Sequence, residues 1–183
     1  LMLTAALNPC PCGFMGDNAN ACTCSDYQIQ RYLSKLSGPL MDRIDIHLEV
    51  PRLPHSELLD KAKNHGESSE DIRKRVIKAR DKQQARFKDT NILCNAEMTP
   101  PQIKDHCALD DEGYILLKRA VQSMHLSARA YDRMLRLSRT IADLDNSDMI
   151  QAHHLAEALQ YRAVDKLYSC LLYTSPSPRD FAI

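Results

Sequence analysis

Hydrophobic residues follow two different patterns along the chain, and the change between them divides it into two parts. Residues 1–7 form a nearly continuous apolar run, and residues 44–50 alternate between apolar and polar side chains up to Pro51. A continuous run is typical of a buried strand, and strict alternation is typical of a half-buried one. We therefore expect strands at both places, with a loop rich in proline and glycine over residues 8–26 and a short helix over residues 26–36.

Apolar positions recur every three or four residues in the last third of the chain, which predicts helices with one apolar face. The first such helix carries Tyr114, Leu117, Val121 and Met124, and the next carries Tyr131, Met134, Leu135, Ser138, Ile141 and Ala142. A break at Asn146 and Ser147 ends the second helix, and a final helix contains the segment HHLAEALQYR.

Capping residues predict where several of these helices begin. Ser68 with Asp71 three residues later resembles a capping box, and the long helix behind it is highly charged. Thr99 is followed by two prolines, which suit the first turn of a short helix. Ser127 is the expected N-cap of the helix that carries Met134.

The fold class that these patterns predict is an α/β segment followed by an all-α bundle, with a boundary near residues 87–98. Residues 51–66 resemble a linker. The chain begins inside an apolar run and without Met, so we expect that an N-terminal part is missing. Residues 168–183 change composition abruptly and carry Ser-Pro-Ser-Pro, and we interpret them as a non-native tail outside the fold.

Composition narrows the class of protein but names no partner. The 183 residues are 44% hydrophobic and 26% charged, which is ordinary for a globular protein. The formal net charge is zero, so binding to nucleic acid or to a membrane surface would need a local patch. No apolar run approaches the roughly 20 residues of a membrane-spanning helix. The seven cysteines are unevenly spread, which favours a reducing cytoplasm over a secreted disulfide scaffold.

Four cysteines lie in two Cys-x-Cys pairs within the loop that follows the first apolar run. They are Cys10, Cys12, Cys22 and Cys24. Four thiolates suit tetrahedral Zn²⁺, and a site closed by four protein ligands is structural rather than catalytic. The alternatives are four free thiols or two disulfides. We favour a metal site because two close pairs in one Gly/Pro-rich loop rarely arise by chance.

Three polar residues are candidates for a phosphate site, each with an ordinary alternative. Asn8 ends the first apolar run, where a turn residue is common but where doubly wound sheets also place their ligand site. Arg43 precedes the alternating segment, as a solvated charge or as a group that stabilises a transferring phosphoryl group. Arg129 stands two residues after Ser127, where a positive charge opposes the helix dipole unless an anion lies nearby.

Several segments together resemble the magnesium-chelatase-like AAA+ ATPases. They are NPCPCG, CTC, LSGPLMDRIDIHLEV, GESS, LSARAYDRMLRLSRTIADL and HLAEALQYRAVD. The resemblance runs in order from residue 1 to about residue 167. It implies that residues 1–90 are the α/β end of an AAA+ ATPase core with a four-cysteine insertion, and that residues 91–167 are an all-α helical lid domain.

The same resemblance assigns a role to each phosphate candidate. Asn8 matches sensor 1, which orients the attacking water, and Arg43 matches the arginine finger, which acts on ATP bound by the next subunit. Arg129 matches sensor 2, which contacts phosphate in its own subunit. The cofactors implied are ATP and Mg²⁺. The Walker A lysine loop and Walker B acids are not found in this sequence, so we expect the parent protein to be the ATPase and this segment alone to be inactive.

Family resemblance implies a homo-hexameric ring that couples ATP hydrolysis to DNA remodelling, as a helicase motor of the branch-migration or competence type. The alternatives are a chelatase-type ATPase that remodels a partner protein and a non-catalytic, zinc-stabilised interaction module. A basic helix is a candidate DNA patch or an ordinary solvated face. Its residues are Arg73, Lys74, Arg75, Lys78, Arg80, Lys82, Arg86 and Lys88. His153 and His154 are expected at a helix surface and edge rather than as metal ligands.

Overall fold

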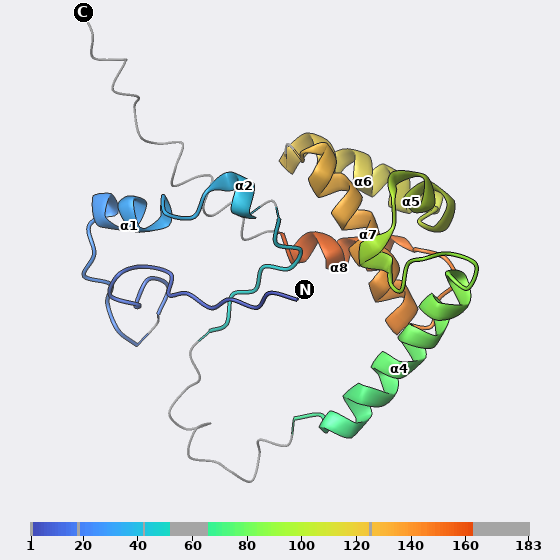
Figure 1. Cartoon of the computed structure of the whole chain (residues 1–183). Coiled ribbons are helices and arrows are strands. Elements are labelled where there is room, and N and C mark those ends of the chain that lie inside the picture. The colour runs from blue at the N-terminus through green and yellow to red at the C-terminus, as the bar shows by residue number, and fades with distance from the viewer. Residues whose placement is uncertain (1, 18, 42, 52–65, 125, 163–183) are drawn as a thin grey trace, which may run out of the picture.

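The computed structural model describes residues 2–17, 19–41, 43–51, 66–124 and 126–162, and the architecture of these residues is helical (Figure 1). The N-terminal part contains α1 (Asp26–Leu33) and the short α2 (Gly38–Met41). The C-terminal part contains α4 (Ser69–Arg86), a 3₁₀ helix (Asn95–Glu97), α5 (Pro100–His106), α6 (Asp111–Met124), α7 (Ala128–Leu144) and α8 (Ala152–Gln160). Residues 52–65 of the predicted linker and the predicted tail 168–183 lie outside the described residues.

The two predicted strands are wrong for the residues that the structure describes. Residues 2–7 and 44–50 belong to no strand, and the described part of the chain has only an isolated parallel bridge between Leu109 and Ile150. A strand exists only where its backbone groups pair with a neighbouring strand, and these two segments have no such partner here. Their apolar side chains stay exposed as a result, as at Leu3 and Val50. The α/β core is therefore not seen, whereas the helical second part is.

The helical bundle forms around α7, which contacts α4, α5, α8 and the 3₁₀ helix. Its apolar face closes over one core cluster: Phe87, Met98, Ile103, Cys107, Leu117, Met134, Leu135, Ile141, Ala142, Ile150, Leu155 and Ala158. The three-and-four spacing predicted from the sequence places Leu117, Met134 and Leu135 in this core, as expected. None of the described helices is long and apolar enough to cross a membrane.

Helix starts follow the predicted caps. The Ser68 hydroxyl accepts a hydrogen bond from the Asp71 backbone N–H, 3.1 Å, and α4 begins at the next residue. Thr99 and Gln102 form a capping box in front of α5. The Ser127 hydroxyl accepts from the Ala130 N–H, 3.2 Å, at the start of α7. These bonds satisfy backbone donors that have no partner inside the helix.

A buried carboxylate, Asp143 near the end of α7, joins three elements of the bundle. Two guanidinium nitrogens of Arg86 on α4 donate to its two oxygens, 2.5 and 2.8 Å. The amide of Asn95 donates at 2.8 Å, and Arg139 donates at 3.2 Å. Burial acts to raise the pKa of Asp143, but the hydrogen bonds from Arg86 and Asn95 outweigh it and hold the pKa below its usual range. The carboxylate is therefore charged and fully partnered inside the protein.

Asp143→Asn should destabilise the bundle by about 3–5 kcal/mol, because it leaves the buried guanidinium of Arg139 and the partly buried guanidinium of Arg86 without their counter-charge. Denaturant unfolding followed by circular dichroism measures this loss. Asp148→Asn is the control, since Asp148 is exposed and its ion pair with Lys82 is a surface pair; it should change stability by less than about 0.5 kcal/mol. Equal unfolding midpoints for Asp143→Asn and the wild type would contradict the central role of Asp143.

The lowered pKa of Asp143 also predicts how its contribution depends on pH. A carboxyl group whose pKa is depressed by folding stabilises the protein fully above its unfolded-state pKa of about 3.9. The stabilisation is lost as the pH falls through the lower folded-state pKa. The difference in unfolding free energy between wild type and Asp143→Asn should therefore be constant near neutral pH and shrink only in strong acid.

Candidate functional site

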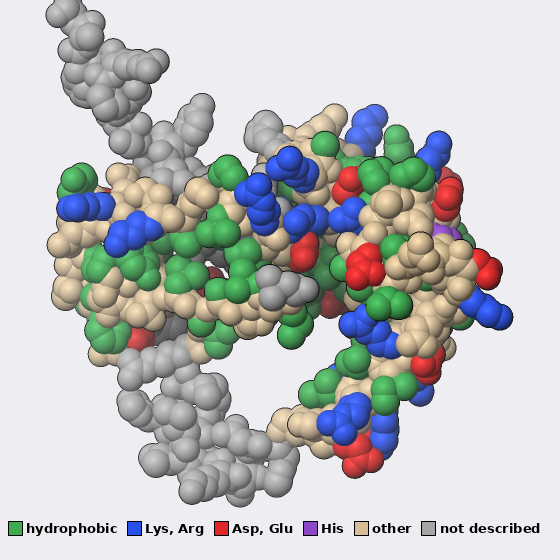
Figure 2. All heavy atoms as spheres, viewed as in Figure 1, with side chains coloured by type: hydrophobic (Ala, Val, Ile, Leu, Met, Phe, Trp, Pro, Cys, Tyr) green, Lys and Arg blue, Asp and Glu red, His purple; other side chains and the backbone are tan. Residues whose placement is uncertain are grey.

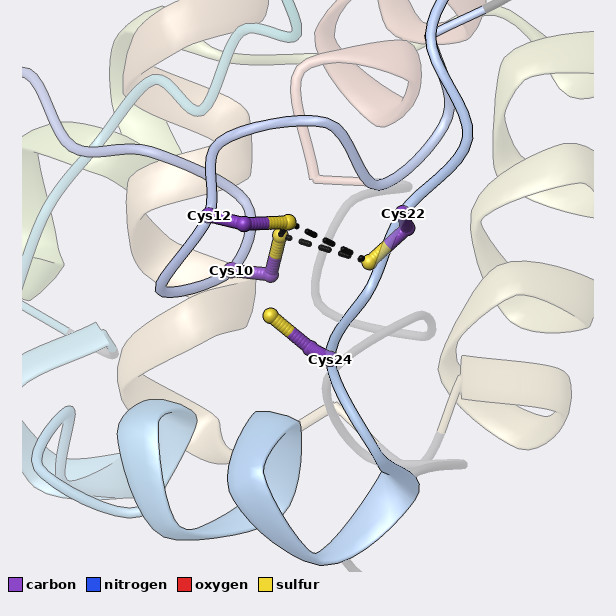
Figure 3. A group of neighbouring side chains, drawn as sticks. All are labelled: Cys10, Cys12, Cys22 and Cys24. Carbon is purple, nitrogen blue, oxygen red and sulfur yellow. Dashed lines mark hydrogen bonds between the residues drawn. The ribbon is translucent and has the colours of Figure 1, made fainter.

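The four cysteines predicted as metal ligands come together in the structure (Figure 3). Their Sγ atoms all lie within 4.8 Å of one another. The Sγ of Cys10 lies 3.3 Å from that of Cys12 and 3.7 Å from that of Cys22, and the Sγ atoms of Cys12 and Cys22 are 3.5 Å apart. Four sulfurs at the usual 2.3 Å from Zn²⁺ in a tetrahedron are about 3.8 Å from one another. The thiols thus form a donor set that can hold one metal ion.

Local sequence explains how each pair is presented. The Gly13 N–H donates to the Cys10 carbonyl, 3.0 Å, and Gly13 has a φ of 82°, so the chain turns sharply after the first pair. A left-handed φ of this kind favours glycine. The second pair runs directly into Ser25, which caps α1. Since a capped helix end has a defined direction, α1 holds Cys22 and Cys24 opposite the first turn.

The apolar core beneath the cysteines is small. Its buried members are Cys10, Ile29 and Leu33, with Cys12, Met15, Cys22, Cys24 and Tyr32 packed around them. A cluster of this size supplies little hydrophobic stabilisation, and structural zinc is a common substitute for a core in small units. The composition of the cluster therefore fits a structural ion that ties the loop to α1.

Thiol acidity differs within the cluster. Hydrogen bonds from the Phe14 and Thr23 backbones lower the pKa of Cys12 to about 5, against the effect of burial. A backbone hydrogen bond involving Cys12 acts to lower the pKa of Cys24, but burial and the neighbouring cysteine side chains raise it to about 12. The pKa of Cys12 is thus lowered while that of Cys24 is raised, and the described cysteines form no disulfide with one another. A bound Zn²⁺ would displace the remaining protons, because metal ligation requires thiolates.

The three phosphate candidates lie on exposed parts of the chain. Asn8 lies just before the cysteine turn, with its amide packed over Gly13. Arg43 follows α2, and its Nη1 donates to the Pro39 carbonyl, 3.0 Å. Arg129 is the second residue of α7. No hydrogen bond or ion pair among the described residues joins Asn8, Arg43 and Arg129 to one another, and their assigned roles stay predictions.

The predicted basic helix is α4, and much of its charge is neutralised. Lys74 pairs with Glu70 at 3.0 Å, Arg75 with Glu67 at 2.6 Å, and Lys82 with Asp148 at 3.2 Å. Arg86 belongs to the buried network around Asp143 and is not available to DNA. Positive and negative side chains lie close together on α4 in Figure 2. Four exposed basic residues make no ion pair with a described residue: Arg73, Lys78, Arg80 and Lys88.

A second cluster of metal-type side chains contains Asp145, His153 and His154. His154 is 1% exposed, so the expectation that it lies at the surface is wrong, whereas His153 is exposed. The Nδ1 atom of His154 accepts from the Gln151 N–H, 3.0 Å, and its Nε2 lies 3.0 Å from an Asp145 oxygen. Since Nδ1 accepts, Nε2 carries the proton of the neutral ring and donates to Asp145. This arrangement supports the capping of α8 rather than metal binding.

Sequence reasoning missed the contacts that join residues 44–47 to the bundle. Arg162 donates to the Ile44 carbonyl at 3.0 Å, and Arg133 pairs with Asp45 at 3.0 Å. These residues are more than 80 positions apart in the sequence, and no local pattern predicts such a pairing. The segment NPCPCG, in contrast, indicates the cysteine cluster directly.

Comparisons with known proteins connect both parts of the chain to one family. The family model described as magnesium chelatase, subunit ChlI, matches residues 1–58, and the model described as magnesium chelatase, subunit ChlI C-terminal, matches residues 66–162. YifB of Escherichia coli is 45% identical, and competence protein ComM of Haemophilus influenzae is 42% identical, each over 165 residues. These matches cover 90% of this chain but 31% of each relative, so the chain spans less than a third of their length.

Zinc should be present at about one ion per chain in protein purified under reducing conditions. Replacing Cys22 and Cys24 with Ser should bring the metal content close to zero, because two of four thiolate ligands are lost. Elemental analysis after gel filtration measures the ion, and Cys94→Ser, outside the cluster, should keep it. Metal-free wild-type protein that also fails to take up added Zn²⁺ would show that the cysteines are plain thiols.

Proposed function

Because the chain belongs to the magnesium chelatase ChlI family, we propose that it is the C-terminal part of a ring-forming AAA+ ATPase that couples ATP hydrolysis to DNA remodelling. The observation that carries the proposal is the ordered match of both family models, with Arg43 inside the first and Arg129 inside the second. In this proposal residues 1–90 complete the ATPase core and residues 91–167 form the helical lid. The boundary stays a prediction, and α4 on its N-terminal side is joined to α7 through Asp143.

The chemistry of phosphoryl transfer explains why exposed arginines matter. The transition state spreads negative charge over the transferred group, so catalysis depends on positioning and on positive charge more than on covalent steps. Arg43 and Arg129 are both exposed and have room to reach an anionic ligand. A guanidinium in the first turn of α7 opposes the helix dipole, and a phosphate beside it would remove that cost.

Each candidate has a different part in the proposed reaction. Asn8 would orient the attacking water beside the terminal phosphate. Arg43 would act in trans, on ATP held by the next subunit, and Arg129 would contact phosphate in cis from the lid. ATP and Mg²⁺ would be held mainly by residues outside this chain, so the isolated segment should not hydrolyse ATP. An arginine supplied in trans makes hydrolysis depend on assembly, and we propose a homo-hexamer.

Two observations support DNA as the substrate: the name of one relative and the exposed basic residues on and beside α4. ComM of Haemophilus influenzae is named a competence protein, and this chain is 42% identical to the part of it that it matches. The exposed Arg73, Lys78 and Arg80 on α4, and Lys88 just beyond its end, make no ion pair with a described residue. Phosphate contacts by such side chains supply most of the affinity in sequence-independent DNA binding. We place the protein in the cytoplasm, where reduced thiols persist.

A chelatase-type ATPase that remodels a partner protein is the second candidate. The names of both family models favour it, since each is named for magnesium chelatase. Stimulation by DNA separates the two, because a motor on DNA should hydrolyse ATP faster when DNA is bound. A non-catalytic zinc module is the third candidate, supported by the cysteine cluster alone, and any ATP hydrolysis by the full-length protein would exclude it.

In the full-length protein, Arg43→Ala should lower kcat for ATP hydrolysis by about 10³-fold while ATP still binds. The expected cause is the loss of positive charge at the transition state and not of ground-state affinity. Turnover assays and fluorescent-nucleotide titration separate the two effects. Arg31→Ala, an exposed arginine at the end of α1, is the matched control and should hydrolyse ATP normally. Unchanged turnover in Arg43→Ala would remove Arg43 from the reaction.

Replacing Arg73 and Arg80 together with Gln should weaken binding of the full-length protein to DNA and lower the salt dependence of binding by about two phosphate contacts. Fluorescence anisotropy over a range of salt concentrations measures both quantities. Lys104→Gln with Lys118→Gln removes the same charge from α5 and α6 and should leave binding unchanged. Equal salt slopes for both double variants would show that α4 does not contact DNA.

A further inference from the structure

The segment that follows Arg43 is fastened to the helical bundle by side chains. The Nη2 of Arg162 donates to the Ile44 carbonyl at 3.0 Å, directly beside Arg43 in the sequence. One residue later, a carboxylate oxygen of Asp45 lies 3.0 Å from Nη1 of Arg133 on α7. Both contacts come from the lid and reach a segment that lies about 90 to 120 positions earlier in the chain. The segment is thus attached to the lid rather than only to its own neighbours.

A backbone contact adds a third attachment. The His47 N–H donates to the Tyr161 carbonyl, 2.9 Å, at the C-terminal end of α8. Carbonyl groups at a helix end have no partner inside the helix, so this bond satisfies one of them. Figure 1 shows the segment passing the end of α8. Residues 44–47 therefore follow any displacement of α8.

Arg162 and Arg133 differ in burial, so they are expected to contribute differently to folding stability. Arg162 is 2% exposed, which fixes its guanidinium in the interior. The Arg133 side chain is 25% exposed and that of Asp45 is 61% exposed, so their ion pair lies near the surface. Exposed ion pairs contribute little to folding stability. An effect of the Arg133–Asp45 pair on activity would therefore not be explained by unfolding.

Arg43 has little to hold it in place by itself. Among the described residues, its guanidinium has one hydrogen bond, to the Pro39 carbonyl four residues earlier. The preceding α2 has four residues, too short to be a rigid support. A finger that must reach a neighbouring phosphate needs a fixed base, because errors of about 1 Å can cost two orders of magnitude in rate. The backbone N–H groups of Arg43 and Ile44 donate within the local turn, to Leu40 and Met41 at 2.9 and 3.1 Å. The nearest contacts that come from outside this turn are those of Arg162 with Ile44 and of Arg133 with Asp45.

The contact between Arg133 and Asp45 also connects Arg129 on α7 to the segment that carries Arg43. Arg129 and Arg133 are four residues apart on α7, so their side chains leave the same face of the helix. Asp45, the partner of Arg133, is two residues from Arg43. A shift of α7 caused by phosphate at Arg129 would therefore be passed to the base of Arg43 through a single ion pair.

We propose that Arg133 and Arg162 are positioning residues that hold Arg43 from the helical lid, so that nucleotide bound in one subunit governs the finger offered to the next. This inference rests on the proposed function, in which Arg43 acts in trans. It adds a route of communication that runs through Asp45 and the Ile44 carbonyl. Neither Arg133 nor Arg162 touches the nucleotide in this scheme.

Charge reversal in the full-length protein tests the ion pair. Arg133→Asp alone and Asp45→Lys alone should each lower kcat for ATP hydrolysis about tenfold, with KM for ATP changed less than about twofold, because Arg43 is misplaced while the nucleotide still binds. The double variant Arg133→Asp/Asp45→Lys restores an ion pair of opposite sense and should recover kcat to within about threefold of wild type. Arg133→Lys keeps the charge and should stay close to wild type.

Two controls distinguish positioning from folding. Arg119→Asp reverses the charge of an exposed arginine on α6, outside the contacts with residues 44–47, and should leave kcat unchanged. Thermal unfolding of Arg133→Asp should match the wild type. Arg162→Ala removes a buried side chain and can fail to fold, so the Arg133 and Asp45 variants carry the test. A kcat loss that the double variant does not recover, or that comes with a lowered melting temperature, would assign Arg133 to structure alone.

Failure of this inference differs from failure of the proposed function. If Arg43→Ala stops hydrolysis and Arg133→Asp leaves kcat unchanged, Arg43 is the finger but the lid does not position it. If Arg43→Ala hydrolyses ATP at the wild-type rate, the finger role is lost, and the positioning role of Arg133 and Arg162 is lost with it. A loss of kcat in Arg43→Ala, Arg133→Asp and Asp45→Lys, with recovery of kcat in the double variant, would support the finger role of Arg43 and its positioning by Arg133.

Discussion

The arrangement of the bundle depends on the hydrogen bonds that the buried carboxylate of Asp143 accepts. It accepts from Arg86 at the end of α4, from Asn95 in the 3₁₀ helix and from Arg139 on its own helix. Arg139 in turn donates to the carbonyls of Ser147 and Asp148, and so fixes the turn between α7 and α8. Removing one partner from a buried charge network is costly. The direction of α8 therefore follows from the same network that attaches α4.

The direction of α8 matters for the proposed role of Arg43, because the end of α8 meets the segment behind Arg43. The His47 N–H reaches the Tyr161 carbonyl, and Arg162 reaches the Ile44 carbonyl. A series of contacts thus leads from the Asp143 network through α8 to the residues that follow Arg43. The four-cysteine cluster is a separate unit with its own small core, and a bound ion would stabilise it independently of the bundle.

Local signals in the sequence predicted local structure well. Ser68 and Ser127 marked the starts of α4 and α7, and the spacing of apolar residues identified the core face of α7. The cysteine cluster was also predictable, since both pairs lie in one short loop. The strands predicted at residues 1–7 and 44–50 are wrong for the described residues, because a strand needs a partner and local patterning cannot supply one. The Asp143 network was missed because Arg86 has the same local context as the solvated charges of α4, and its partner lies 57 residues away.

A structure of the full-length protein with a slowly hydrolysed ATP analogue and Mg²⁺ would show whether Arg43 reaches a phosphate in the neighbouring subunit. We expect a closed ring in which Arg43 of one subunit lies within hydrogen-bond distance of the terminal phosphate in the next, and Arg129 contacts phosphate in its own subunit. The Arg133–Asp45 pair should be intact in every nucleotide-bound subunit. A monomer that binds the analogue, or a ring in which Arg43 points away from every phosphate, would rule out Arg43 as a finger acting in trans.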